Sequence, residues 1–119
     1  LLPGGRLRRD SVSINGRPET LPDINLNIGF FGARGVSFEA GISEIGQEEA
    51  DIKQVLIPRC FLPVIVADGS KWGQIAPYTY LPAKEVSHII TSDLAPREMV
   101  EQFRAAGTIV ETVKVNEPS

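Results

Sequence analysis

The segment Asp68–Gly69–Ser70–Lys71 carries the side chains best suited to chemistry in this sequence, and it follows the apolar run Pro63–Ala67. A lysine supplies a positive charge and three donors, while a serine hydroxyl and the backbone amides of a glycine loop add neutral donors. This combination suits a phosphomonoester, with Lys71 and Ser70 as phosphate ligands. The same tetrapeptide also suits a turn that caps a helix.

A second candidate segment, Gly32 to Ser37, follows the apolar stretch Leu26 to Phe31 and has the glycines of a loop. Arg34 can bind an anion through two parallel hydrogen bonds, or it can be solvated at the surface. Glu39 is the nearby acid, and it can accept a hydrogen bond from a sugar hydroxyl. From this loop we expect ligand contacts by Gly32, Arg34, Gly35, Ser37 and Glu39.

A third polar segment, Thr91 to Asp93, ends the apolar run that begins at Val86. Asp93, like Asp68, can accept from sugar hydroxyls, but its position favours a role as the N-cap of a helix that begins near Pro96. His88 has no adjacent acid or nucleophile in sequence, which favours a structural histidine with satisfied hydrogen bonds over a general base.

Three aromatic residues near these segments can stack on a sugar, although aromatic side chains more often pack in a core or an interface. They are Trp72, Tyr78 and Tyr80.

The elements that must position these residues alternate between strands and helices. Strands are predicted over Leu7–Ile14 (before the turn Asn15–Gly16), Leu26–Phe31, Pro63–Ala67, Val86–Thr91 and Thr108–Val115, and helices over Gln47–Cys60 and Pro96–Ala106. The continuous apolar run at Pro63–Ala67 is typical of a strand covered on both faces. The last strand, helix and strand form a βαβ unit, so the fold class is α/β with a mostly parallel sheet and flanking helices. In such sheets ligands collect beyond the carboxyl ends of the strands, where the three polar segments lie.

Composition limits the remaining possibilities. The 119 residues fit a single domain, 1–119, with an ordinary globular composition of 42% hydrophobic and 23% charged residues. A net charge of -3 disfavours direct binding of nucleic acid. One cysteine and one histidine predict no metal site, and we expect no cofactor. No apolar run is long enough to span a membrane, which favours the cytoplasm.

The chain begins with Leu1–Leu2–Pro3–Gly4–Gly5, which has the pattern of a strand that ends in a glycine turn. We therefore expect this chain to be the later part of a larger domain, with an upstream segment absent from it.

The order of these motifs resembles DeoR-type bacterial transcriptional regulators over nearly the whole chain. The resemblance depends most on Asp68-Gly69-Ser70-Lys71-Trp72-Gly73 followed by Thr91-Ser92-Asp93, and it includes Gly4-Gly5, the Gly32 to Ser37 segment, Glu39 and Gly41. It implies the effector-binding domain of a repressor, similar in fold to ribose-phosphate isomerase and glucosamine-phosphate deaminase, that senses a phosphorylated sugar. It also implies that DNA is bound only through an N-terminal helix-turn-helix, which this chain lacks.

The related enzymes hold substrate phosphate with a lysine after an equivalent strand, which implies that role for Lys71, with Ser70 nearby. Their preceding loop carries catalytic acids, whereas the Gly32 to Ser37 segment here has neither Asp nor His. This difference favours sensing over turnover, and we expect no catalytic residues and a homo-oligomer. The alternatives are a sugar-phosphate isomerase or deaminase domain, whose acids an upstream segment would supply, and a structural dimerisation module.

Overall fold

The structure, a computed structural model of the chain, describes residues 26–115. The strand predicted at Leu7–Ile14, the turn at Asn15–Gly16 and the segment Leu1–Gly5 lie outside these residues.

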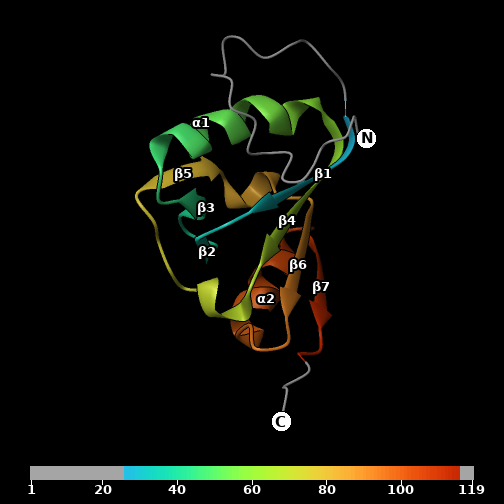
Figure 1. The fold of residues 1–119 in the computed structure, drawn as a ribbon. Coiled ribbons are helices and arrows are strands. Elements are labelled where there is room, and N and C mark those ends of the chain that lie inside the picture. The colour runs from blue at the N-terminus through green and yellow to red at the C-terminus, as the bar shows by residue number, and fades with distance from the viewer. Residues whose placement is uncertain (1–25, 116–119) are drawn as a thin grey trace.

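Four strands form a fully parallel sheet (Figure 1). They are β1 (Leu26–Gly32), β4 (Cys60–Ala67), β6 (His88–Ser92) and β7 (Ile109–Val113), in the spatial order β1-β4-β6-β7. All four correspond to strands expected from apolar runs, and no strand end differs from its expected position by more than three residues. The α/β class with a mostly parallel sheet is therefore confirmed.

Two helices flank this sheet, α1 (Gln47–Leu56) and α2 (Arg97–Ala105). The prediction that the first helix continues to Cys60 is wrong. A short 3-10 turn, Ile57–Arg59, follows α1, and Cys60 is the first residue of β4. The physical reason is Pro58, which has no N–H to donate to the helix and ends its hydrogen-bond ladder.

A second, antiparallel sheet was not expected from the sequence. It consists of β2 (Gly35–Ser37), β3 (Gly41–Glu44) and β5 (Tyr78–Leu81), in the order β2-β3-β5. Strand β2 has only three residues and lies inside the segment expected to be a loop, so that expectation is wrong from Gly35 onward. Its short strands have too few residues for alternation to be recognised in the sequence.

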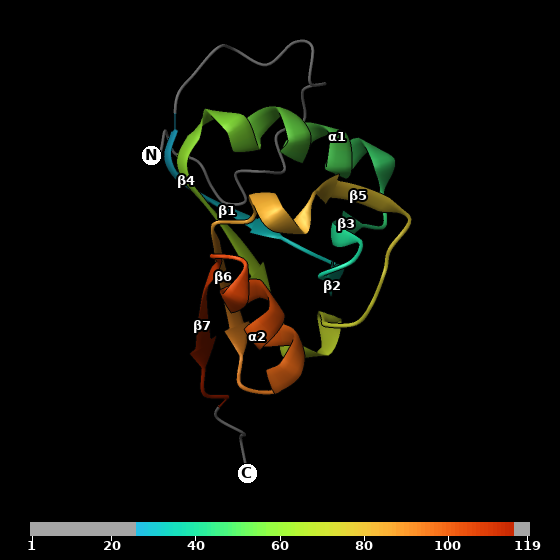
Figure 2. The same cartoon turned by 180° about the vertical axis from the view of Figure 1, so that it is seen from behind.

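The hydrophobic core lies between the inner face of the parallel sheet and the other elements. Figure 2 shows α2 against this face, where Phe103 of the helix is fully buried with Phe31, Ile65 and Ile89 of the strands. The same cluster includes residues of α1 and of the small sheet, among them Ile42. Both helices and the small sheet therefore share one core with the inner face.

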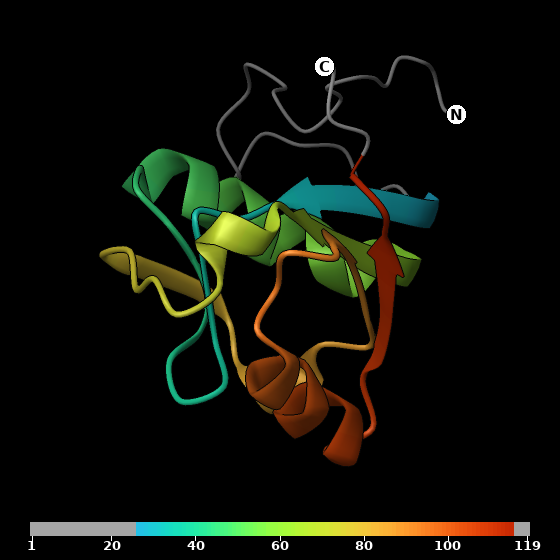
Figure 3. The ribbon, with the colours of Figure 1, turned by 90° about the horizontal axis from the view of Figure 1, so that it is seen from below.

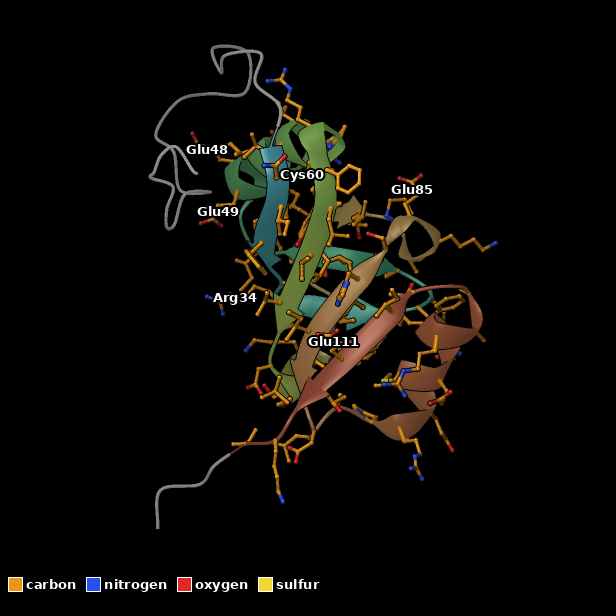
Figure 4. The ribbon with its side chains drawn as sticks, turned by 90° about the vertical axis from the view of Figure 1, so that its right-hand side faces the viewer. Arg34, Glu48, Glu49, Cys60, Glu85 and Glu111 are labelled. Atoms are coloured by element: carbon orange, nitrogen blue, oxygen red, sulfur yellow. The ribbon has the colours of Figure 1, made fainter. Side chains whose placement is uncertain are left out.

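The outer face of the parallel sheet, seen in Figure 4, is covered by no element between residues 26 and 115. The side chains of Phe30, Val66 and Ile109 on this face are 56%, 41% and 57% exposed. The expectation that the run Pro63–Ala67 is covered on both faces is thus wrong for the described part of the chain, because its two flanking helices lie on the same side.

Candidate functional site

The carboxyl ends of β1, β4 and β6 lie level along one edge of the parallel sheet. Gly32 is in register with Val66, and Ala67 is in register with Thr91. Figure 3 looks onto this edge, where the turn Gly69–Lys71 lies between the segment after β1 and the segment after β6. Ligands of open α/β sheets bind at this edge, so the polar segments identified in the sequence lie where a binding site is expected.

Asp68, the first residue after β4, is the centre of a hydrogen-bond network. The hydroxyl of Ser70 donates to its Oδ2 at 2.9 Å, and the hydroxyl of Ser92 donates to Oδ1 at 3.3 Å. The backbone N–H of Gly69 in turn donates to Ser92 Oγ at 2.9 Å. The hydrogen bond from Ser70 lowers the pKa of Asp68, and Ser92 and the backbone N–H groups of Gly69 and Ser70 lower it further. Asp68 is therefore an exposed, ionised acceptor.

Ser92 was not among the expected site residues, although it links the ends of β4 and β6 through these bonds. Its position in the sequence, at the end of an apolar run and beside Asp93, is the signal from which it could have been identified.

Lys71 ends the turn after β4, and its side chain is partly exposed. Its N–H donates to the carbonyl of Asp68 at 2.9 Å, which fixes the turn. Its ammonium has no hydrogen bond or ion pair with any residue from 26 to 115. A positive charge at the carboxyl edge is thus available to an anion.

Trp72 anchors the turn to the core. Its indole N–H donates to Thr91 Oγ1 at 2.9 Å, and its ring meets Phe103 edge-on at 5.5 Å. Trp72 also bridges to Val36 of β2, and the next N–H, of Gly73, donates to the Val36 carbonyl at 2.8 Å. Trp72 and Tyr80 are both buried in the core, which leaves only the partly exposed Tyr78 of the three aromatic candidates available for stacking on a sugar.

Gly35 and Ser37 have packing roles in β2. A Cβ on Gly35 would lie 2.5 Å from the Gln74 carbonyl oxygen and from Ser43 Oγ. Ser37 is buried, and its hydroxyl accepts a hydrogen bond from the N–H of Ala40 at 3.2 Å in the β2–β3 turn. The local fold therefore accounts for both residues.

Arg34 and Glu39, by contrast, are exposed. Arg34 lies between β1 and β2, with its side chain at the edge of the sheet in Figure 4 and its N–H donating to the Ser43 carbonyl at 3.0 Å. Glu39 lies in the β2–β3 turn, where its neighbour Phe38 packs edge-on against Phe103 at 5.3 Å. The structure places Arg34 at the carboxyl edge and Glu39 in a turn that packs on α2.

Asp93 does not cap the following helix. The N-cap of α2 is Pro96, and no side chain makes a capping hydrogen bond there. Asp93 is exposed directly after β6, and its N–H donates to the carbonyl of Val113 at 3.0 Å. The capping role that the sequence favoured is thus wrong, and the carboxylate of Asp93 remains at the carboxyl edge.

A buried ionic cluster beneath the end of β1 was missed by the sequence analysis. The Lys53 ammonium donates to Glu44 Oε2 at 2.6 Å and to the Gly32 carbonyl at 2.7 Å. The Tyr80 hydroxyl donates to the same carbonyl at 2.7 Å, and the ring of Tyr80 lies 5.1 Å from the Lys53 ammonium. Burial and the charge of Glu44 raise the pKa of Tyr80. The available signal was a lysine on the same helix face as Ala50 and Leu56.

His88 lies on the outer face of the sheet. Its Nε2 is buried and accepts or donates no hydrogen bond among the described residues, with Glu111 Oε2 3.5 Å away. The expected satisfied histidine is therefore not found in this part of the chain. Residues 26–115 contain no group of three side chains placed to bind a metal ion, and no helix among them is long and apolar enough to cross a membrane.

Comparison with known proteins gives one family and several regulators. The family model of the DeoR C-terminal sensor domain matches residues 1–93. A proposed aga operon transcriptional repressor of Escherichia coli is 27% identical over 98% of the chain. The HTH-type transcriptional regulator GlpR of Haloferax volcanii is 27% identical over 92% of it, and the HTH-type transcriptional regulator GolR of Listeria innocua is 24% identical over 90%.

The chain spans less than half of the length of these relatives: 44% of the first two and 43% of the third. The matched family model includes the segment after β1, the turn Gly69–Lys71 and the end of β6. The carboxyl-edge residues thus belong to the region that the comparison covers.

Proposed function

The chain belongs to the family of DeoR C-terminal sensor domains, and we propose that it senses a phosphorylated sugar, with Lys71 holding the phosphate. The relatives are transcriptional regulators, so the domain's role is regulatory. The sugar phosphate, the residues that bind it and the action as a repressor are the proposal.

The observation that carries this proposal is the Lys71 ammonium at the carboxyl edge, without a partner among residues 26–115. A hydrogen bond between an ammonium and a phosphate oxygen is charge-assisted and stronger than one between neutral groups. The two buried charged side chains between residues 26 and 115, Lys53 and Glu44, are paired with each other. Lys71 is therefore the group best placed to attract a phosphate.

The network around Asp68 refines the roles of its neighbours. The hydroxyl of Ser70 already donates to Asp68, so in this arrangement it positions the turn rather than donating to phosphate. The carboxylate of Asp68 repels a phosphate but accepts from hydroxyl groups. Arg34, Asp68 and Asp93 are all exposed at this edge. We propose that Asp68 and Asp93 accept hydrogen bonds from the sugar hydroxyls and that Arg34 donates to anionic or other oxygen atoms of the ligand.

The same network supports sensing without turnover. A general base works best when its pKa is close to the operating pH. The hydrogen bonds from Ser70 and Ser92 lower the pKa of Asp68, which makes it a poor proton acceptor at neutral pH. Asp68 is therefore poorly suited to act as the base of an isomerase or deaminase.

The remaining part of the proposal concerns the whole protein. Two relatives are named as HTH-type regulators, which supports a helix-turn-helix in the part that the chain does not span. Ligand binding would change DNA affinity only if the two states of the protein bind the ligand differently. We propose that the whole protein is a cytoplasmic homo-oligomer, since helix-turn-helix proteins bind paired half-sites as dimers.

Isothermal titration of the chain against a panel of phosphosugars tests the proposal. The panel contains ribose 5-phosphate, fructose 6-phosphate, glucose 6-phosphate and glycerol 3-phosphate, together with the unphosphorylated compounds, and product formation is followed in parallel. We expect saturable binding of at least one phosphorylated member, without conversion. Lys71→Ala should weaken it by about 10- to 100-fold, since a hydrogen bond to a charged group contributes about 1.5–3 kcal/mol.

The matched control is Lys84→Ala, which removes an exposed lysine of the 3-10 turn Ala83–Glu85. Its affinity should equal that of the parent. Equal affinities for Lys71→Ala and the parent would remove Lys71 from the site, while conversion of a phosphosugar would identify an enzyme instead of a sensor.

A further inference from the structure

Ser92, the last residue of β6, uses its hydroxyl group within the fold. The hydroxyl oxygen accepts from the backbone N–H of Gly69 at 2.9 Å, and the O–H donates to Asp68 Oδ1 at 3.3 Å. A serine hydroxyl has a single proton to donate. Ser92 therefore gives that proton to Asp68 and has none left for a ligand.

The carboxylate of Asp68 is held from two elements. Ser70, in the same turn, donates to Oδ2 at 2.9 Å, whereas Ser92, 24 positions further along the chain and on the neighbouring strand, donates to Oδ1. Two donors on different oxygens restrict the rotation of the carboxylate. Each carboxylate oxygen has a second lone pair that can accept from another group, and Asp68 is exposed. The carboxylate is thus oriented by the protein while it can still accept hydrogen bonds from a ligand.

The contact with Ser92 is fixed because the turn after β4 packs closely against the segment after β6. A Cβ on Gly69 would lie 2.7 Å from Ser92 Oγ and 2.6 Å from the backbone nitrogen of Ala95. The N–H of Ala95 donates to the Ser92 carbonyl at 3.2 Å, so the chain turns back directly after β6. This close approach lets the N–H of Gly69 reach Ser92 and sets the position of the hydroxyl that faces Asp68.

We propose that Ser92 is a positioning residue of the effector site, which orients the Asp68 carboxylate from the neighbouring strand so that it accepts hydrogen bonds from the hydroxyls of the sugar phosphate. Ser92 acts through Asp68, while Lys71 holds the phosphate. The inference rests on the proposed function and deepens it, because recognition of the sugar then depends on β6 as well as on the turn after β4.

The test compares Ser92→Ala and Ser92→Thr with the parent by isothermal titration, using the panel phosphosugar that binds the parent most tightly and inorganic phosphate as a competitor. Ser92→Ala removes the donor to Oδ1 and should lower the phosphosugar affinity by about three- to tenfold, as for the loss of one hydrogen bond. Ser92→Thr keeps the hydroxyl and should stay within about twofold of the parent. The affinity for inorganic phosphate should change by less than about twofold in both variants, because Lys71 is unchanged.

The matched control is Ser87→Ala. The hydroxyl of Ser87, which directly precedes β6, donates to the Pro63 carbonyl of β4 at 3.4 Å. This variant therefore also removes a hydroxyl that joins the two strands, but at the end of β6 opposite to Ser92. Its phosphosugar affinity should equal that of the parent. A loss as large as that of Ser92→Ala would reflect a general loosening of the sheet and would contradict the positioning role.

The pKa of Asp68 gives a second readout, which needs no ligand. The hydrogen bond from Ser70 is the main cause of its lowered pKa, and the hydrogen bond from Ser92 lowers it further. In the free protein, Ser92→Ala should therefore raise the pKa of Asp68, whereas Ser92→Thr and Ser87→Ala should leave it unchanged. The NMR chemical shift of the Asp68 carboxyl carbon across the acidic range measures this pKa. An unchanged pKa in Ser92→Ala overturns the inference, because the hydroxyl would then not hold the carboxylate.

The affinities separate this inference from the proposed function. Equal phosphosugar affinity in the parent and Ser92→Ala overturns the role of Ser92 and leaves that of Lys71 intact. An equal loss in Ser92→Ala and Ser92→Thr also overturns it, since the hydroxyl would not be the group that matters. So does a parallel loss of phosphosugar and inorganic phosphate, which would show that the whole turn had moved. A parent that binds no member of the panel removes the proposed function, and this inference with it.

Discussion

The ammonium of Lys53 lies 2.6 Å from Glu44 Oε2, and both side chains are at least 89% buried, with 8% and 11% of their surfaces exposed. A buried charge that loses its partner is strongly destabilising, whereas removing both charges costs much less. The second oxygen of Glu44 accepts from the N–H of Ile45 at 3.1 Å, a bond that a glutamine can keep.

Lys53→Met should therefore lower the free energy of unfolding by about 3–5 kcal/mol, because Glu44 would remain buried and unpaired. The double variant Glu44→Gln, Lys53→Met should recover at least about 1.5 kcal/mol of this loss. Urea denaturation measures both, with Gln54→Ala on the exposed side of α1 as the control, expected within about 0.5 kcal/mol of the parent. A double variant less stable than Lys53→Met would contradict the pairing.

Gly69→Ala should destabilise the turn after β4. The added Cβ would lie 2.6 Å from the backbone nitrogen of Ala95 and 2.7 Å from the carbonyl carbon of Leu94, neither of which is a flexible side chain. We expect a loss of about 1–3 kcal/mol in unfolding free energy, as for other overpacked sites. Gly32→Ala is the matched control, because no atom of residues 26–115 lies within 4 Å of its added Cβ, and it should lose much less stability. Thermal unfolding of both variants measures the difference, and equal losses would contradict a rigid close approach at Gly69.

Asp68 should stabilise the fold only when it is ionised. Its pKa is lowered in the folded state by the hydrogen bond from Ser70, so its contribution is present above the unfolded value of about 3.9 and is lost as the pH falls through the folded pKa. The stability difference between the parent and Asp68→Asn should be constant above about pH 5 and shrink below about pH 4. Denaturation curves across this pH range test the direction of this pH dependence. The NMR chemical shift of the Asp68 carboxyl carbon follows the titration of the group directly. A difference that grows on acidification would be inconsistent with a lowered pKa.

Cys60 should be a slow nucleophile in the folded chain. Burial raises its pKa to about 11, and the thiol lies 3.5 Å from the Leu56 carbonyl, to which it donates. The thiolate is the reactive form, so alkylation by iodoacetamide near pH 8 should be at least about tenfold slower in the folded than in the urea-unfolded chain. Mass spectrometry of the modified chain over time gives both rates, and equal rates would contradict the burial of this thiol.

The parallel sheet could be predicted from the sequence because its strands are apolar runs followed by polar residues, as Pro63–Ala67 and Asp68 illustrate. The carboxyl-edge position of Asp68, Lys71 and Asp93 followed from that topology. The end of α1 was predicted too late in the sequence because the apolar residues keep helical spacing beyond Pro58. Spacing alone does not take into account that proline ends a helix.

The small sheet and the cluster beneath β1 depend on contacts that the sequence does not display. Strand β2 is too short for a periodic pattern. Its Gly35 has to be a glycine because the carbonyl of Gln74, 39 positions further along the chain, leaves no room for a Cβ. Lys53 and Glu44 are separated by a helix turn and a loop, and their pairing depends on the packing of α1 against the small sheet. Such relationships arise from tertiary structure rather than from local propensity.

Trp72 is the only tryptophan of the chain, so all of its indole fluorescence arises one residue after Lys71. The ring is buried, donates to Thr91 and meets Phe103 edge-on, and these contacts join the binding turn, β6 and α2 around a single fluorophore. A ligand that moves the turn must change the polarity or the quenching around this indole. The protein thus contains its own optical probe of the event that the regulator is proposed to sense, and titrations can be read without any added label.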